Sequence, residues 1–242
     1  MSDFEVIVYE KKDGKGYITL NRPQALNAYN MQMRDELYQV LEAVRDDPDV
    51  RVVIFKGAGE KAFCAGADLT EFLTAPSPTI ARQVRWERDV WGLLLSISKP
   101  IIAALHGYVL GDGVEIAMCC DIRVASEDAQ FGAPEVGLGI IPAAGGSQTI
   151  PRVTGRAHAL DMLLTGRWVK AEEALRMKLV NWVVVRGDLL ATVEKLADKI
   201  AGYDPLAVSY AKQSVTRGLD LSLGQGLELE ANLGRQLQAA RD

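Results

Sequence analysis

The chain has little histidine and little cysteine. Its 242 residues include two histidines, His106 and His158, and three cysteines. Two histidines disfavour a histidine-rich metal site and a histidine-based catalytic triad. The cysteines, Cys64, Cys119 and Cys120, lack the spacing of a zinc site or a disulfide framework, and they fit a reducing compartment.

An excess of positive charge and a long hydrophobic run are also missing. The net charge is −5 at pH 7, and the basic residues are scattered along the chain, which disfavours a nucleic-acid interface. No apolar run approaches the length of a membrane span, and the N-terminal segment lacks the charged-then-apolar order of a signal peptide. With 48% hydrophobic and 24% charged residues, the composition is typical of a globular domain. We expect a cytoplasmic protein with neither nucleic-acid nor membrane partners.

A hairpin and a helix are expected at the start of the chain. Apolar and polar residues alternate over residues 4–20 around Asp13-Gly14, which predicts a β-hairpin. Helical spacing after Asn30 predicts a helix that ends near Asp47. Further helical periodicity covers residues 80–97, behind a connection over Ala75–Pro78 that we expect to be mobile.

The remaining elements follow a strand-strand-helix rhythm. Apolar runs predict buried strands at residues 51–55 and 101–105. Further strands are expected at residues 121–125 and 180–185. Helices are expected from about Gly113 and at residues 143–150, 157–164, 171–177, 189–201, 205–217 and 223–239. No phosphate-binding glycine fingerprint follows the first strand, so the rhythm favours an α/β fold of stacked units over a dinucleotide-binding fold. We expect a core over residues 1–188 and a helical region over 189–242.

Two loops of small residues are candidate binding elements. One covers residues 57–69, and the other is Gly111-Asp112-Gly113, directly before a short apolar helix. Small side chains let a ligand approach backbone amides, and a helix N-terminus favours negative charge. Together the loops would form an oxyanion hole. Taken alone, each loop favours the simpler interpretation of a tight turn.

Two glutamates accompany these loops. Glu115 lies in the first turn of the apolar helix, and Glu135 follows Pro134. Desolvation and a like-charged neighbour raise the pKa of a carboxyl group, which suits acid-base chemistry near neutrality. Alternatively, Glu115 complements the helix dipole and Glu135 is a solvated loop acid. The joint placement beside a candidate oxyanion hole favours catalysis.

Four segments carry a family resemblance: NRPQALNA at 21–28, AFCAGADL at 62–69, KPIIAALHGYVLGDGVEIAMCCDIRVASEDAQFGAPEVGLGIIPAAGGSQTIPR at 99–152 and LTGRWVKAEEALRMKLVNWVV at 164–184. In order and spacing they resemble the enoyl-CoA hydratase (crotonase) family, over nearly the whole chain. The resemblance implies a crotonase-like spiral of repeated strand-strand-helix units with a helical C-terminal trimerisation domain. It also implies a homotrimer or a dimer of trimers, and coenzyme A thioester chemistry.

The resemblance further implies hydration of a 2-enoyl-CoA to the 3-hydroxyacyl-CoA. The oxyanion hole falls on the N–H groups of Ala67 and Asp112. Glu115 and Glu135 hold one water, with Glu115 activating it for attack on C3 and Glu135 protonating C2. The assignment of acid and base between them stays open, because coupled carboxyls titrate jointly.

Coenzyme A enters as part of the substrate, so the resemblance implies no metal and no other cofactor. The acyl-CoA contacts it implies, largely through backbone, together with pocket residues that are equally consistent with core packing, are Gln24, Ala25, Leu26, Ala28, Ala65, Gly66, Asp68, Leu69, Tyr108, Leu110, Gly111 and Pro134. We expect Asp68 to cap the following helix rather than to react. Trp86 and Trp91 are expected either to cover the acyl tunnel or to pack, and Cys119-Cys120 to pack mid-helix.

The sequence departs from the family pattern in two places. Asp112 stands where relatives usually have glycine, and its carboxylate would oppose a developing enolate unless it points away or is protonated. We favour a turn residue that tolerates left-handed angles, or a helix cap, over a third catalytic acid. The chain also ends at Asp242, before a final helix found in many relatives, so another segment or a neighbouring subunit would supply that part of the site.

Two alternative functions remain. A crotonase-fold isomerase or C–C bond hydrolase is possible because one scaffold supports many reactions, although the presence of both glutamates favours hydration. A catalytically idle acyl-CoA- or RNA-binding protein is disfavoured by the same glutamates and by the absence of a basic patch.

Overall fold

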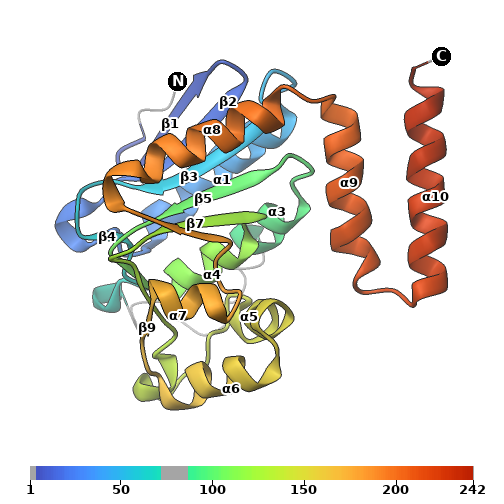
Figure 1. The fold of residues 1–242 in the computed structure, drawn as a ribbon. Helices are drawn as coiled ribbons and strands as arrows, with labels where there is room; N and C mark the ends of the chain where they lie inside the picture. The colour runs from blue at the N-terminus through green and yellow to red at the C-terminus, as the bar shows by residue number, and fades with distance from the viewer. Residues whose placement is uncertain (1–3, 72–86, 242) are drawn as a thin grey trace.

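A computed structural model describes residues 4–71 and 87–241. Its strands form two sheets (Figure 1). The larger sheet has six strands in the order β1 (Ile7–Lys12), β2 (Lys15–Leu20), β3 (Val52–Gly57), β5 (Ile101–Leu105), β7 (Ile122–Ser126) and β10 (Trp182–Val184). The smaller sheet has four strands in the order β4 (Ala62–Cys64), β6 (Tyr108–Leu110), β8 (Gln130–Gly132) and β9 (Val169–Lys170).

The predicted hairpin is confirmed. β1 and β2 pair antiparallel, from Ile7 opposite Leu20 to Lys12 opposite Lys15. Asp13 and Gly14 between them have φ values of 51° and 73°, the positive angles of a two-residue turn that matches the strand twist. β2 then pairs in parallel with β3, which continues the larger sheet toward β5.

The central strands are covered on both faces, as continuous apolar runs predict. In β3, Val53 and Phe55 belong to the main hydrophobic core. Val52 and Ile54 alternate with them and pack toward Val193 on helix α8 (Leu189–Ala201). Figure 1 shows α8 lying across this face of the larger sheet.

Nine α-helices are described, and most agree with the predicted ranges. The start of α1 is confirmed, because the Asn30 side chain accepts a hydrogen bond from the Met33 N–H at 2.9 Å. Besides α8, the helices are α1 (Met31–Asp46), α3 (Val90–Ser96), α4 (Asp112–Cys119), α5 (Gly146–Thr154), α6 (Arg156–Thr165), α7 (Ala171–Arg176), α9 (Pro205–Gly218) and α10 (Leu223–Ala239). Short 3₁₀ helices are η1 (Pro23–Ala25), η2 (Leu69–Glu71), η3 (Glu135–Leu138) and η4 (Arg186–Asp188).

The strand-strand-helix repetition is present. β3 and β4, β5 and β6, and β7 and β8 each add one strand to the larger sheet and one to the smaller sheet. The corner between β5 and β6 requires glycine, because a Cβ on Gly107 would lie 2.0 Å from the Lys61 carbonyl oxygen. Loops that follow the short strands of successive units therefore meet at one edge of the smaller sheet.

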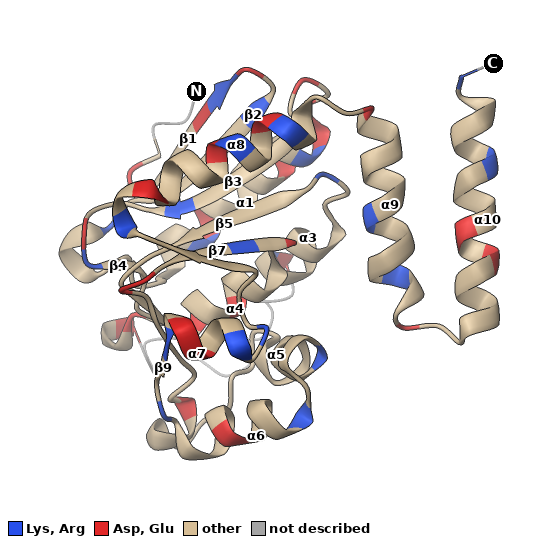
Figure 2. Ribbon diagram, in the orientation of Figure 1, with Lys and Arg blue, Asp and Glu red and all other residues tan. Residues whose placement is uncertain are grey.

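Helices α9 and α10 form an arm beside the core (Figure 1). On α9, Lys212 Nζ donates to the Lys99 carbonyl at 2.9 Å and to Asp121 at 2.7 Å. Charged residues of both signs are interspersed over the core and also occur along the arm (Figure 2). The division at residue 188 stays a prediction, since α8 packs on the sheet and only α9 and α10 extend from it.

The connection over residues 75–78 and most of the helix predicted over residues 80–97 fall outside the described residues, and α3 is the described remainder. The placement of Cys119-Cys120 mid-helix is wrong, because Cys119 is the last residue of α4 and Cys120 is its C-cap. Both are buried, and burial raises the pKa of the Cys120 thiol to about 12. Within the described residues, no helix combines the length and the apolar character needed to cross a bilayer.

Candidate active site

Loops from four parts of the chain enclose one cavity of about 470 Å³. They are the loop after β4, the start of α4, η3 and the segment that leads into α5. The cavity brings together most of the residues singled out in the sequence: Ala65, Gly66, Ala67, Leu69, Trp91, Gly111, Asp112, Glu115, Pro134 and Glu135. Residues as far apart in the sequence as Ala65 and Glu135 thus line the same cavity.

Glycines let the β4 loop and the start of α4 touch backbone to backbone. A Cβ on Gly113 would lie 2.3 Å from the Cys64 carbonyl oxygen, and a Cβ on Gly66 would lie 3.2 Å from the Leu110 carbonyl oxygen. Gly66 and Gly111 also have φ values of 101° and 50°, which glycine adopts without strain. These contacts hold the two predicted oxyanion loops against each other.

Ala67 lines the cavity, and the pairing of its segment sets the direction of its N–H. Ala67 pairs with Tyr29 in an isolated parallel bridge. In it Tyr29 N–H donates to the Gly66 carbonyl and Asp68 N–H donates to the Tyr29 carbonyl, each at 2.8 Å. Successive N–H groups of an extended segment point to opposite sides, so the Ala67 N–H faces away from Tyr29. Among the described residues this N–H has no acceptor.

Asp112 is the first residue of α4. Its N–H belongs to the first-turn amides that a helix leaves for acceptors outside itself, at the positive end of the dipole. The expectation of left-handed angles or a cap at Asp112 is wrong, because the positive φ and the N-cap position both fall on Gly111. Asp112 also affects Tyr29, whose pKa is raised first by burial and then by the negative charge of the Asp112 carboxylate.

Glu115 is held rigidly. Its side chain is buried, with 2% of the residue exposed, and Oε1 accepts hydrogen bonds from the N–H groups of Ala144 at 2.9 Å and Gly146 at 2.7 Å. Glycine at position 146 leaves room for this carboxyl group, since a Cβ there would lie 2.9 Å from Glu115 Oε1 and the side chain would have to shift. The two N–H donors occupy one oxygen and leave Oε2 as the oxygen available to a bound molecule.

Glu135 is also buried, with 9% exposed, so its interpretation as a solvated loop acid is wrong. It is the first residue of η3, and its Oε2 has no hydrogen-bond partner among the described residues. Burial is the main cause that raises its pKa, and the charge of Glu115 adds to it, against a backbone hydrogen bond that lowers it. The two carboxyl groups therefore differ in their surroundings: Glu115 is held by N–H donors of two other residues, whereas Oε2 of Glu135 has no partner among the described residues.

Other predicted contacts are divided between two cavities or lie outside both. Gln24 and Leu26 line a second cavity of about 270 Å³. Ala25 and Ala28 line neither cavity, although Ala25 lies in η1. Leu110 is buried. Tyr108 packs edge-on against Trp168 at 5.6 Å between ring centroids. Trp91 lines the main cavity, and Trp86 lies outside the described residues.

The sequence did not reveal one side of the cavity. Tyr29 and Trp91 meet edge-on with ring centroids 5.0 Å apart, and the Tyr29 hydroxyl and Trp91 Nε1 are buried without partners among the described residues. The small residues around Gly145-Gly146 resemble the other two loops and could have indicated this side. The lining residues that were missed are Tyr29, Arg34, Leu138, Ile140, Ile141, Pro142, Ala143 and Ala144.

Comparison with known proteins gives consistent matches. The model of the enoyl-CoA hydratase/isomerase family matches residues 10–242. A short-chain-enoyl-CoA hydratase of Clostridium acetobutylicum is 41% identical over 93% of this chain and 86% of its own length. A crotonyl-CoA hydratase of Syntrophomonas wolfei subsp. wolfei is 40% identical over 95% of this chain and 88% of its own length. The crystal structure of an enoyl-CoA hydratase from Bacillus anthracis superposes with a TM-score of 0.91 at 36% identity, over 96% of this chain and 90% of that one.

Proposed function

The chain belongs to the enoyl-CoA hydratase/isomerase family, and on that premise we propose that it adds water to a 2-enoyl-CoA thioester to give the 3-hydroxyacyl-CoA. The predicted resemblance, crotonase fold and enzyme class are confirmed by these relatives. The observation that carries the proposal is the pair of buried glutamates, Glu115 and Glu135, which line the same cavity as Ala67 and Asp112.

The thioester carbonyl accepts hydrogen bonds from the N–H groups of Ala67 and Asp112. Addition to C3 moves electrons onto this oxygen and forms an enolate. Donors already aimed at that position stabilise the charge without reorganisation, and each contributes roughly 2.7–4 kcal/mol. The contacts around Gly66 and Gly113 fix the two loops and so support this role.

The glutamates handle the water. Glu115, fixed through Oε1, takes a proton from the water with its other oxygen as the hydroxide oxygen bonds to C3. Glu135, whose raised pKa favours the protonated form, gives its proton to C2. Return of the proton from Glu115 to Glu135 restores the site, so one water is added in total.

The two cavities suit different parts of the substrate. Apolar side chains of Leu69, Trp91, Leu138, Ile140 and Ile141 line the main cavity and suit an acyl chain. The cavity around Gln24 and Leu26 suits coenzyme A. Hydration changes no net oxidation state, so the chemistry requires no redox cofactor, and the proposed N–H donors perform the polarisation that a metal ion would otherwise supply. The buried thiols favour the cytoplasm as its location.

Crotonyl-CoA tests the proposed activity. We expect the chain to consume it with loss of the conjugated-enone absorbance, and mass spectrometry to find a product heavier by one water. Release of a free acid or migration of the double bond in a 3-enoyl-CoA, without hydration of any short, aromatic or alicyclic 2-enoyl-CoA, would assign another reaction of this fold.

Replacing Asp112 by glycine should preserve kcat or raise it by up to about tenfold. The backbone N–H remains, and a carboxylate that opposes the enolate is removed. The lost first-turn charge should cost the helix about 0.3–1 kcal/mol. Steady-state kinetics and thermal melts measure the two effects. A clear fall in kcat with an unchanged melting temperature would instead give the carboxylate a part in catalysis.

We also propose a homotrimer or a dimer of trimers. The arm exposes a series of apolar side chains, with Leu219 81% and Leu223 80% exposed in the single chain. Burial of this apolar surface would favour association. Sedimentation equilibrium should give a trimer or hexamer mass, and Leu219→Asp with Leu223→Asp should lower it. A wild-type monomer with full activity would overturn the proposal.

A further inference from the structure

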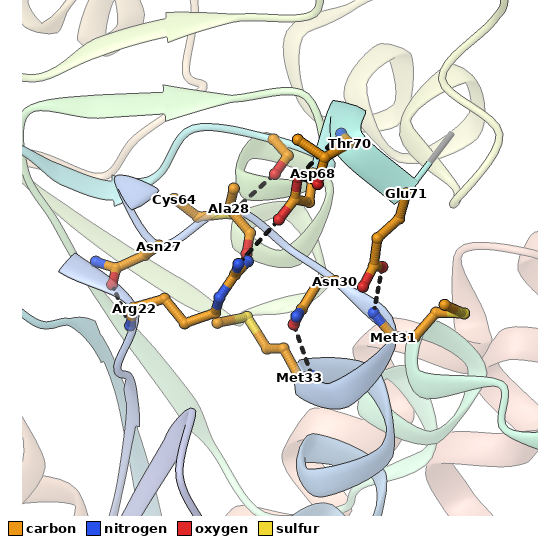
Figure 3. Close-up of polar contacts among 11 residues, drawn as sticks. Arg22, Asn27, Ala28, Asn30, Met31, Met33, Cys64, Asp68, Thr70 and Glu71 are labelled. Carbon is orange, nitrogen blue, oxygen red and sulfur yellow. Dashed lines mark hydrogen bonds and ion pairs between the residues drawn. The ribbon is translucent and has the colours of Figure 1, made fainter. Parts of the chain in front are cut away.

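An ion pair lies behind the oxyanion loop (Figure 3). One nitrogen of the Arg22 guanidinium contacts Asp68 Oδ2 at 2.9 Å, and the other donates to the Ala28 carbonyl at 2.6 Å. The Arg22 and Asp68 side chains are 15% and 13% exposed. The guanidinium therefore joins two segments that are far apart in the sequence, in surroundings where a charge interaction is only partly screened.

Those two segments are the ones that set the direction of the Ala67 N–H. Ala28 precedes Tyr29 and Asp68 follows Ala67, and Tyr29 and Ala67 form the isolated bridge. The Arg22 contacts on Ala28 and Asp68 each lie one residue away from the pairing that sets the direction of the Ala67 N–H. A bond on each side of the bridge limits rotation of the peptide that carries this N–H.

Arg22 and Asp68 are each fixed by further hydrogen bonds. The backbone N–H of Arg22 donates to Asn27 Oδ1 at 2.9 Å, and the fully buried Asn27 side chain donates to the carbonyls of Ala58 at 2.9 Å and Ala62 at 2.8 Å. At the other end, Asp68 Oδ1 accepts from the Thr70 hydroxyl at 2.6 Å and the Thr70 N–H at 3.1 Å. This is the local cap expected of Asp68, here on the 3₁₀ helix η2.

Arg22 also changes the electrostatics of the site. Hydrogen bonds from Thr70 and Arg22 hold the pKa of Asp68 below its usual value, so Asp68 is ionised at neutral pH. An ionised carboxylate next to Ala67 opposes the build-up of negative charge at the oxyanion position. The guanidinium cancels that charge at short range.

We propose that Arg22 is a positioning residue of the oxyanion hole, which directs the Ala67 N–H into the cavity and cancels the charge of Asp68. The inference rests on the proposed function, because it assumes that a thioester oxygen binds at Ala67. It predicts effects on the stabilisation of an enolate that exceed the effects on substrate binding. A pair that only holds the fold together would lower stability and leave enolate stabilisation unchanged.

The first measurement compares Arg22→Gln with a matched control, Lys15→Gln. Lys15 is a buried cation that bonds Glu194 and Asp198 on α8, across the larger sheet from the cavity. We expect Arg22→Gln to lower kcat by about 10- to 100-fold with KM within about threefold, since small misplacements of a reacting group have effects of this size. Lys15→Gln should keep kcat within about twofold. Equal kcat in both variants would overturn the proposal.

The second measurement requires no turnover. Bound acetoacetyl-CoA, a 1,3-dicarbonyl thioester, ionises to an enolate that absorbs in the near ultraviolet, and its apparent pKa reports the strength of the oxyanion hole. We expect Arg22→Gln to raise this pKa by about one unit, a tenfold change, and Asp68→Asn in the same chain to recover part of the loss. An unchanged pKa, with only a lowered melting temperature, would show a structural pair.

Two results would prevent the direct comparison: an Arg22→Gln variant that does not fold, and a wild type that hydrates no enoyl-CoA. If Arg22→Gln does not fold, Arg22→Lys is measured instead, because it keeps the charge and one contact. It should show the same effects at smaller size. Wild-type kcat and ligand pKa in Arg22→Lys would then overturn the proposal. If the wild type hydrates no enoyl-CoA, the ligand titration still measures Arg22 at the oxyanion hole. Failure of the proposed function is thereby distinguished from failure of the inference.

Discussion

Glu135→Gln should lower kcat for crotonyl-CoA hydration by about 10²–10⁴-fold, the range expected when an acid-base group is lost. An amide of nearly the same shape can occupy the buried position, but it cannot deliver a proton to C2. Since binding is expected to change little, KM should stay near the wild-type value. Stopped-flow or steady-state loss of the enone absorbance measures the effect. Wild-type kcat would remove Glu135 from the mechanism.

The stability of the same variant separates catalysis from folding. Burial raises the pKa of Glu135 in the folded state, so the proton is bound more tightly there than in the unfolded chain. The bound proton therefore stabilises the folded state below the unfolded-state pKa, and this stabilisation is lost as pH rises through the folded-state pKa. At neutral pH the buried charge of Glu135 lowers the free energy of unfolding of the wild type. Glu135→Gln should therefore melt at an equal or higher temperature. The difference should shrink as pH falls toward the ordinary glutamate pKa of about 4.3. A lower melting temperature at neutral pH would give Glu135 a structural role.

Glu115→Gln should lower kcat over the same range of about 10²–10⁴-fold, for a different reason. To keep the hydrogen bonds from Ala144 and Gly146, the new amide must turn its oxygen toward them. Its NH₂ group then faces the bound water as a donor, so no base remains to accept a proton. Kinetics with crotonyl-CoA, at pH values from 6 to 9, measure the loss.

Gly146→Ala provides a matched test of the geometry around Glu115. The added methyl would lie 2.9 Å from Glu115 Cγ and Oε1, so it should displace the carboxyl group and lower kcat without removing it. Gly137→Ala, at a site with no neighbour within 4 Å of the new Cβ, serves as the control. Equal activity in both alanine variants would show that the position of Glu115 is not critical.

Local sequence signals predicted the elements whose ends are defined by turn or capping residues. The Asp13-Gly14 turn, the Asn30 cap of α1 and the full extents of α8 and α10 agree with the structure. These features are encoded within a few residues of the position they define. The family resemblance supplied the overall fold, which local patterns alone left as a rhythm of strands and helices.

Features made by distant contacts were not predicted. β4, β6 and β8 each have three residues, too few to show a period of two. The apolar lining over residues 138–144 resembles an ordinary loop until the structure places it over Glu115. Arg22 and Asp68 are 46 positions apart, and nothing near either residue indicates their pairing.

The glycine contacts between the two oxyanion loops bear on how this sequence can change. Gly66, Gly111 and Gly113 each face backbone or the Glu135 carboxyl group at the place where a side chain would begin. Asp112 stands between two of them, where only its N–H is assigned a task. In saturation mutagenesis, most substitutions at positions 66, 111 and 113 should lower activity, whereas most substitutions at position 112 should be tolerated. Evolution of new acyl-CoA chemistry on this scaffold is therefore free to vary the side chain beside the proposed oxyanion N–H, because the glycines keep the backbone in place.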